Sequence, residues 1–175
     1  MKLANIGTSV IARHYSARAS SSSMQIALTF RENCKSLNGT WCFPGGKFDD
    51  NELYLLDSMR RELQEETNLT LESETIHLIG VQEELTDGTA WLNFVFTGCT
   101  SHPEMLHNCE PHKFREVRWV DWNLESATFL DQTVTPISHI SQEALITFRG
   151  WLVTNETRLP LKTVTQATAL GCSVL

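Results

Sequence analysis

The sequence predicts an α/β fold in which a mixed sheet has helices packed on both of its faces. Two patterns lead to this prediction: strand-like segments lie on both sides of an expected helix at 51–67, and a second helical pattern follows at 141–153. At 175 residues, the chain is long enough for one domain with a substantial core and too short for two comfortable ones.

The first thirty residues are expected to supply two strands of this sheet. Residues 3–12 carry three β-branched apolar residues, and apolar residues alternate along 24–30. The polar, serine-rich segment 13–23 between them is expected to be a hairpin connection. A polar stretch at 31–40 then leads toward the helix.

The expected helix has recognisable start and stop signals. It should begin near Asn51, with Asp50 or Asn51 capping its free amides, and run to about Thr67. Asn68 marks its end, because Asn tolerates the left-handed conformation that often closes a helix.

The second half of the chain has the patterns of three further strands and a closing helix. The strands are expected at 76–85, 89–97 and 116–120, and the helix at 141–153. An Asp-Gly turn within 86–88 is typical of a hairpin between the first two strands. We therefore expect one domain at residues 1–153 and a loosely attached tail at 154–175.

Three glutamates gather on one face of the expected helix. Residues three and four positions apart share a helix face, so Glu62, Glu65 and Glu66 should converge while Met59 and Leu63 face a core. An oxygen-rich site without histidine suits a hard cation such as Mg²⁺, which completes its shell with water and phosphate oxygens. The cluster indicates metal-assisted attack on a phosphate ester or anhydride. The competing interpretation is a solvated helix face.

The segment 45–69 resembles the Nudix box, whose pattern is glycine, five residues, glutamate, seven residues, then Arg-Glu-aliphatic-any-Glu-Glu-any-Gly-aliphatic. The matching residues are Gly46, Glu52, Arg61, Glu62, Leu63, Glu65, Glu66 and Leu69. Two departures stand out: eight residues separate Glu52 from Arg61, and Asn68 replaces the glycine. An extra residue inside a helix would rotate all that precedes it by about 100 degrees, so we expect it in the loop at 49–53.

The resemblance implies the Nudix α/β/α sandwich over most of residues 2–153, since Glu116 to Trp119 also looks like the Glu-any-any-Trp strand common after the box. It implies catalytic roles for Arg61, Glu62 and Glu65, with Glu62 orienting or deprotonating the attacking water. Arg61 is expected to orient the carboxylates, in a charge-assisted pair with Glu52, rather than to touch substrate.

The implied metal ligands are carboxylates and one backbone carbonyl: Glu62, Glu65, Glu66, the carbonyl of Gly46, and Glu110 from a loop outside the box. Mg²⁺ is the expected cofactor, with Mn²⁺ as an alternative. An exposed loop glutamate is an equally good interpretation of Glu110. His107 and His112 are alternative bases, although isolated loop histidines are more often surface residues.

For the choice of substrate, the resemblance favours the MutT-type enzymes, which split a nucleoside triphosphate into the monophosphate and pyrophosphate. One alternative is a hydrolase of a nucleoside diphosphate derivative, such as ADP-ribose or a dinucleotide polyphosphate. Another is a Nudix module that binds a nucleotide without cleaving it. Trp91, Phe94 and Phe129 are candidates for a base pocket, against the simpler interpretation that each packs in the core.

Composition and charge narrow the partners. The formal charge of −7 argues against a binder of nucleic-acid polymers, and no apolar run approaches a bilayer span. Five widely spaced cysteines are expected to be free thiols in a reducing compartment, so we predict a cytoplasmic protein. Residues 1–30 lack acidic residues, which keeps a mitochondrial transit peptide as a minor alternative. A homodimer stays open.

Overall fold

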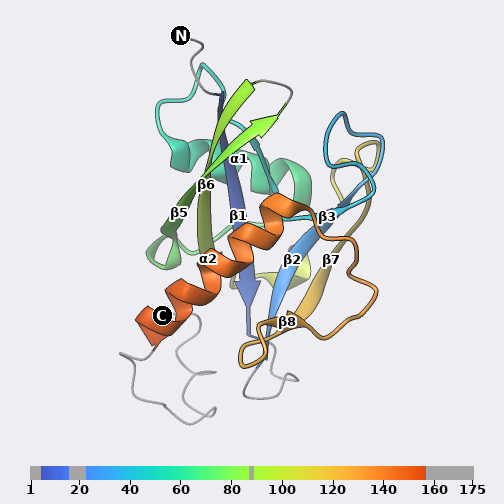
Figure 1. Cartoon of the computed structure of the whole chain (residues 1–175), viewed down its shortest axis with the longest axis vertical. Helices are drawn as coiled ribbons and strands as arrows, with labels where there is room; N and C mark the ends of the chain where they lie inside the picture. Colours follow the sequence, from blue (N-terminus) through green and yellow to red (C-terminus); the bar gives the residue numbers. More distant parts are fainter. Residues whose placement is uncertain (1–4, 16–22, 87–88, 157–175) are drawn as a thin grey trace.

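The structure, a computed structural model, describes residues 5–15, 23–86 and 89–156. One mixed sheet lies between two helices, α1 (Leu55–Thr67) and α2 (His139–Glu156), which cover opposite faces (Figure 1). The expected α/β/α sandwich is therefore confirmed.

The described residues contribute eight strands to the sheet. They are β1 (Asn5–His14), β2 (Ser23–Arg31), β3 (Trp41–Cys42), β4 (Gly45–Lys47), β5 (His77–Thr86), β6 (Thr89–Cys99), β7 (Phe114–Asn123) and β8 (Thr128–Phe129). The order is β5-β6-β1-β2-β7-β8, with β3 paired to β2 and β4 paired to β1. β1 and β6 are parallel, and the other pairs are antiparallel. Two short 3₁₀ helices, Ser73–Thr75 and Pro103–Met105, lie in connections.

The strand β1 is central, and it changes partner along its length. Its residues 7–9 pair with β4, whereas Arg13 and His14 pair with β2. The strand ends two residues later than expected, so Arg13 and His14 belong to it rather than to a connection. The rest of the predicted hairpin connection, at 16–22, and the Asp87-Gly88 turn lie outside the described residues.

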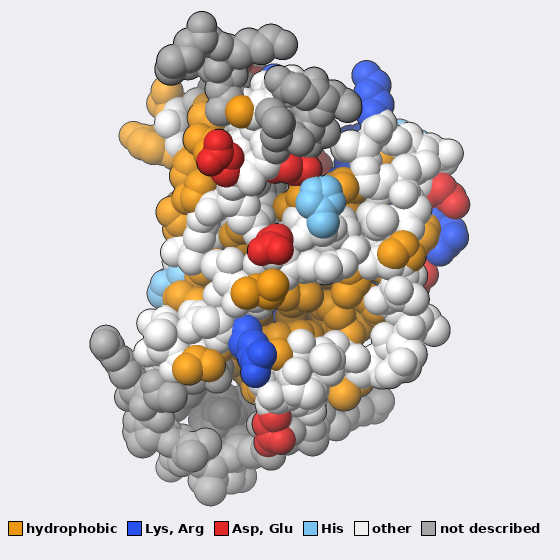
Figure 2. Space-filling model, in the orientation of Figure 1, with side chains coloured by type: hydrophobic (Ala, Val, Ile, Leu, Met, Phe, Trp, Pro, Cys, Tyr) orange, Lys and Arg blue, Asp and Glu red, His pale blue; other side chains and the backbone are white. Residues whose placement is uncertain are grey.

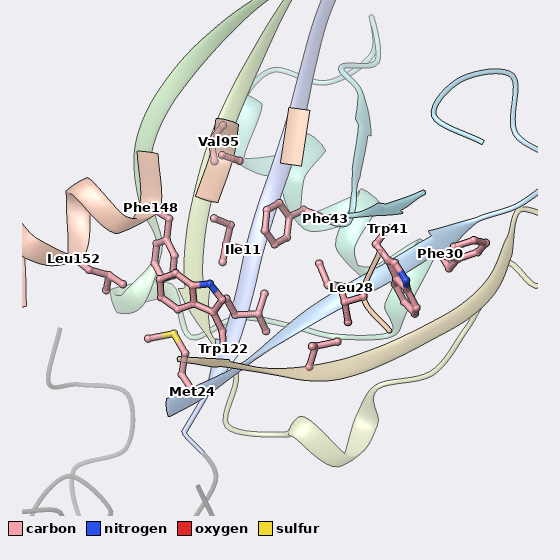
Figure 3. Packing of buried hydrophobic residues seen from close by; sticks show 14 residues of the cluster. Ile11, Met24, Leu28, Phe30, Trp41, Phe43, Val95, Trp122, Phe148 and Leu152 are labelled. Carbon is pink, nitrogen blue, oxygen red and sulfur yellow. The ribbon is translucent and has the colours of Figure 1, made fainter. Parts of the chain in front are cut away.

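One hydrophobic cluster fills the space between α2 and the sheet (Figure 3). Phe148 and Leu152 of α2 meet Trp122, Met24 and Ile11 from three strands, and all five side chains are buried. On the surface of this side of the molecule, hydrophobic side chains gather around a hollow (Figure 2). The closing helix predicted at 141–153 is thus real and runs to residue 156, three residues past the expected domain boundary.

A second cluster attaches α1 to the opposite face. Met59 and Leu63 are fully buried against Val10, Ala27 and Phe96, which confirms the expected core-facing side of this helix. The apolar side of α1 packs against the sheet. The glutamates of this helix therefore point either toward β4 or toward solvent.

The start of α1 differs from the prediction. The helix begins at Leu55, four residues after Asn51, and its N-cap Tyr54 makes no side-chain cap hydrogen bond. Residues before it form a local turn instead: the Asp49 carboxylate accepts from the backbone and side-chain amides of Asn51, and the Glu52 amide donates to the Asp49 carbonyl. Such local bonds compete with helix formation.

The end of α1 agrees with the prediction. The helix closes at Thr67, and Asn68 adopts the left-handed conformation with φ 59° and ψ 14°. Its amide donates to the carbonyl of Gln64, which satisfies one of the free carbonyl groups of the last turn.

The packing of α2 predicts a sharp difference between two residues of that helix. Phe148→Ala should lower the free energy of unfolding by about 3–5 kcal/mol, because it empties a buried site in the larger cluster. Ile146→Ala, at a side chain that is 66% exposed, should change it by less than about 0.5 kcal/mol. Urea unfolding of both variants checks this. Equal losses would mean that α2 does not cover the sheet as described.

Candidate metal and nucleotide site

The site is organised around the two glycines of β4. Gly45 donates its backbone N–H to the Glu66 carboxylate over 3.0 Å. Gly46 packs directly on the Glu62 carboxylate: a Cβ added there would lie 2.5 Å from both of its oxygens. The strand therefore fixes the positions of two carboxylates from α1 on one side, while its other side is bonded to β1.

Gly45 also meets a backbone requirement that only glycine satisfies. Its φ is 153°, and a Cβ would lie 2.8 Å from the Cα of Ser9 and overlap the carbonyl of Thr8. The amide of Val10 donates to the carbonyl of Pro44, and the amide of Phe48 to that of Ile6, so β4 is held to β1 at both of its ends. Close backbone approach at this point is the physical role of the paired glycines.

Arg61 connects the glutamates of the motif through one guanidinium group. Its Nε donates to Glu52 over 2.8 Å, and its Nη1 donates to Glu62 over 2.9 Å and to Glu65 over 3.0 Å. Its Nη2 donates to the backbone carbonyl of Lys47 in β4. The guanidinium holds the pKa of Glu52 below its usual range. This geometry fits the expected role of Arg61 as the residue that orients the carboxylates.

The loop before α1 accommodates the additional residue of the motif. Residues 48–54 are not helical, and the Glu52 carboxylate binds both the amide of Asp49 and the guanidinium of Arg61. The extra residue therefore lies in the loop, as expected, and the spacing from Arg61 to Glu66 within α1 is unaffected. Glu52 is placed as an Arg61 partner rather than beside Glu66.

Glu62 and Glu66 differ from Glu65 in how deeply they are buried. The Glu66 residue is only 4% exposed, and the side chain of Glu62 is 15% exposed, whereas that of Glu65 is 53% exposed. Burial raises the pKa of Glu66 to about 8, against the opposing effects of the Gly45 amide and the positive charge of Arg31. Burial likewise raises the pKa of Glu62, although Arg61 opposes the change.

The loop at 100–113 brings a further carboxylate to the same place. The amides of His107 and Cys109 donate to the carbonyls of Thr67 and Glu66, which attaches the loop to the end of α1. Glu110 is thereby close enough to Glu66 for its negative charge to raise the Glu66 pKa further.

Lys113 adds a positive charge to this group of acids. Its Nζ pairs with Glu110 over 2.6 Å, and its charge also acts on Glu62 and Glu66. The loop is anchored from its other side as well, because Trp119 Nε1 donates to the carbonyl of Pro103 over 2.9 Å.

The carboxylate oxygens of this acidic group have the chemistry that a hard divalent cation requires, but their positions do not yet form a coordination shell. Glu62, Glu66 and Glu110 offer carboxylate oxygens near the C-terminal half of α1, and burial raises the pKa of Glu62 and Glu66, so a cation would stabilise their ionised forms. Glu65 instead turns toward Arg61. Within residues 5–15, 23–86 and 89–156, no set of three or more His, Cys, Asp or Glu side chains is already arranged to hold a metal ion.

A cleft of about 480 Å³ lies beside these carboxylates, on the other side of the β4 glycines. Gly45 and Gly46 line it, and the Gly46 carbonyl oxygen lies 3.2 Å from where a Cβ at the cleft residue Gly7 would be. Three cationic residues also line the cleft: Arg31, Lys35 and Lys47. Gly46 is therefore in contact with both the acidic group and a cationic cleft.

The three aromatic residues considered for a base pocket have different positions. Trp91 lines the cleft, whereas Phe94 packs against the core cluster under α1. Phe129 lines a separate depression of about 420 Å³ between β8 and α2. His107 and His112 are exposed and do not line either cavity.

Sequence reasoning missed most of the cleft. Glu84 and His139 line it together and are bonded over 2.8 Å, but they are 55 residues apart in the chain and carry no local signal. Lys47 directly follows Gly46. Its place next to the motif is the one sequence feature that could have identified it as a residue of the cleft.

Other sequence expectations have simple outcomes. Cys34, Cys42 and Cys109 are free thiols. In the part of the chain that the structure describes, neither helix has the length and apolar character needed to cross a membrane.

The two glycines of β4 should respond differently to alanine. Gly45→Ala pushes against backbone atoms of β1 and should cost about 1–3 kcal/mol of unfolding free energy. Gly46→Ala meets only the mobile end of Glu62, so the protein should keep nearly its full stability while Glu62 is displaced. Thermal unfolding combined with Mn²⁺ titration calorimetry checks both points. Gly150→Ala, in α2 with open space around it, is the control. Unaltered Mn²⁺ binding by Gly46→Ala would contradict the contact with Glu62.

Burial of Glu66 predicts a pH dependence for the metal-free protein. Its pKa is about 8 in the folded state against an ordinary value of 4.5, so between these values the folded state holds a proton that the unfolded chain has released. The free energy of unfolding should therefore be greatest at the acidic end of this window and fall by roughly 1 kcal/mol per pH unit as the pH rises toward 8. Glu66→Gln should flatten this slope. Urea unfolding in EDTA at pH 5, 6, 7 and 8 measures it, and equal slopes for parent and variant would refute the assignment.

Comparisons with known proteins agree with this architecture. Residues 16–136 match the family model described as the NUDIX domain, which is more than half of the chain. Comparison with curated protein sequences found no match.

Several solved structures have the same fold. A MutT/nudix family protein from Enterococcus faecalis is similar with a TM-score of 0.71 and 16% identity, over 90% of this chain and 65% of that chain. A MutT NUDIX hydrolase from Burkholderia pseudomallei has a TM-score of 0.61 and 22% identity, over 83% and 98% of the two chains. The NUDIX domain of Shewanella oneidensis NrtR, crystallised with ADP ribose, has a TM-score of 0.63 and 16% identity, over 87% and 90%.

At these identities the structural likeness concerns the fold, and the chain spans just under two thirds of the Enterococcus protein. The family assignment follows from the match over residues 16–136 together with the residues around Gly46 and Arg61. The chain therefore belongs to the NUDIX domain family.

Proposed function

We propose that this protein is a magnesium-dependent hydrolase of nucleoside triphosphates that releases a nucleoside monophosphate and pyrophosphate. The observation that supports this most directly is the position of Gly45 and Gly46, which contact the Glu66 and Glu62 carboxylates respectively and also line a cleft that has three cationic residues in its wall. Cationic side chains attract phosphate, and carboxylates hold the metal ions that phosphoryl chemistry requires.

Each group has a role in this proposal. Glu62, Glu66 and Glu110, with the carbonyl of Gly46, would hold Mg²⁺ or Mn²⁺. Glu65 would become a further ligand once its hydrogen bond to Arg61 is broken. The bound ions would supply Lewis-acid activation of water and phosphorus. Glu62 would accept a proton from the attacking water at a carboxylate oxygen. Arg61 keeps Glu62 and Glu52 in place.

The cleft supplies binding for the rest of the substrate. Lys35 and Lys47 are suited to a polyphosphate chain, and Arg31 lies where its charge acts on both the cleft and Glu66. Trp91 offers an aromatic face for a base. The ADP ribose in the Shewanella NUDIX domain keeps a nucleoside diphosphate derivative as the alternative substrate, and a domain that binds without cleavage as the other.

Product analysis separates these alternatives. The protein is incubated with Mg²⁺ and a panel of nucleoside triphosphates, ADP-ribose and a dinucleotide polyphosphate. Triphosphate hydrolysis with release of pyrophosphate supports the proposal. Two monophosphates from ADP-ribose, or two nucleotides that share the phosphates of the dinucleotide polyphosphate, would favour the diphosphate-derivative alternative. No turnover at all would favour a binding domain.

Variants of the glutamates test the assigned roles. Glu62→Gln should reduce kcat by about a hundredfold or more, since it removes the proton acceptor. Glu65→Gln should also reduce turnover, by loss of a metal ligand. Glu143→Gln, an exposed residue of α2 with the same change of charge, is the control and should retain parental rates. Parental rates for Glu62→Gln would remove the catalytic assignment.

A further inference from the structure

The two ends of the cleft differ in chemistry. Lys47 lies at one end, beside the glycines that contact the acidic group, and Glu84 and His139 lie at the other. The sheet fixes the separation between Lys47 and Gln82, which lies two residues before Glu84 in β5, because Gln82, Asn93, Gly7 and Lys47 form one row across β5, β6, β1 and β4. Three strand spacings amount to about 14 Å, a distance that a nucleoside triphosphate spans. With phosphates at the Lys47 end, the base is directed toward β5 and the start of α2.

At that far end, Glu84 is held in place by the first residue of α2. His139 Nε2 lies 2.8 Å from Glu84 Oε1, and the adjacent residue Ile140 accepts a hydrogen bond from Gln82 through its backbone carbonyl. The Glu84 side chain is 22% exposed and that of His139 is 64% exposed. Glu84 is therefore the more enclosed of the two, with its carboxylate oriented by a partner from a different element.

Neighbouring polar side chains are committed to one another. Asn93 Nδ2 donates to Ser9 Oγ and to Gln82 Oε1, and Ser9 Oγ lies 3.2 Å from Asn93 Oδ1. Gln82 uses its amide nitrogen on Ile140. The side-chain amides of Asn93 and Gln82 could pair with either a donor or an acceptor on a base. Their bonds to one another instead make them part of the cleft floor. Trp91, paired with Glu84 in the register of β5 and β6, adds an aromatic face next to the carboxylate.

We infer that Glu84, positioned by His139, determines base specificity in this cleft and selects nucleobases that carry an exocyclic amino group. This inference rests on the proposed hydrolysis of nucleoside triphosphates. An ionised carboxylate only accepts hydrogen bonds, so an amino group can donate to it, whereas a carbonyl oxygen at the same place sets a second acceptor against it and forms no hydrogen bond with it. Discrimination by an unpaired polar group is larger than discrimination by shape.

The test compares triphosphates that differ at the amino group: GTP with inosine triphosphate, and CTP with UTP. In the pair whose base the cleft accepts, the parent should favour the amino compound by about tenfold to a hundredfold in kcat/KM. Glu84→Gln, whose amide both donates and accepts, should bring this ratio to within about threefold of unity. Glu83→Gln, at the exposed neighbouring position with the same change of charge, should keep the parental ratio.

His139 is tested as a positioning residue in the same assay. His139→Leu should lower the ratio between paired substrates, and His139→Gln, which keeps a donor for Glu84, should restore it in part. If Glu84→Gln does not fold, the two His139 variants carry the comparison. A general loss of structure would slow both members of a pair equally and leave the ratio unchanged.

The outcomes separate this inference from the function on which it rests. A parent that hydrolyses no triphosphate overturns both. A parent that hydrolyses triphosphates but shows ratios near unity in both pairs, or a Glu84→Gln variant with the parental ratio, overturns the specificity assignment and leaves the hydrolase function standing.

Discussion

The site depends on the close approach of β1, β4 and α1 at two consecutive glycines. Gly45 has no space for a side chain against the backbone of β1, and Gly46 has none against the Glu62 carboxylate. Each glycine also contacts a glutamate of α1: Gly45 donates a hydrogen bond to the buried Glu66, and Gly46 packs directly on the partly buried Glu62. A larger residue at Gly45 would push β4 away from β1, and one at Gly46 would displace the Glu62 carboxylate.

Charge balance is the second constraint, because burial disfavours the ionised form of the carboxylates in the acidic group. Arg61 binds Glu52, Glu62 and Glu65 with one guanidinium, and Lys113 pairs with Glu110 nearby. Glu66 is the most buried of these glutamates, and burial raises its pKa to about 8 against the opposing effects of the Gly45 amide and the charge of Arg31. Its carboxylate therefore gains most from an additional cation, which agrees with its place in the metal-binding set that we propose.

Local patterns were enough to predict much of the fold and the acidic part of the site. The four-residue spacing of Met59 and Leu63 predicted the buried face of α1, and Asn68 predicted its end. The start of α1 was predicted wrongly, because hydrogen bonds around Asp49 and the pull of Arg61 on Glu52 compete with a cap at Asn51. The cleft was beyond prediction for a different reason: Glu84 meets His139 only through tertiary packing, which no periodicity encodes.

The sheet and the helices position different parts of the site, so base selection in the cleft and metal binding by the acidic group can be changed separately. Distances along the row from Gln82 to Lys47 are set by backbone hydrogen bonds of the sheet and cannot shift without breaking it. The acidic group on α1 and the first turn of α2 meet this rigid floor from opposite faces. A side-chain exchange at Glu84 or His139 therefore changes what the cleft accepts while leaving Glu62 and Glu66 where they are, and an exchange at Gly46 does the reverse.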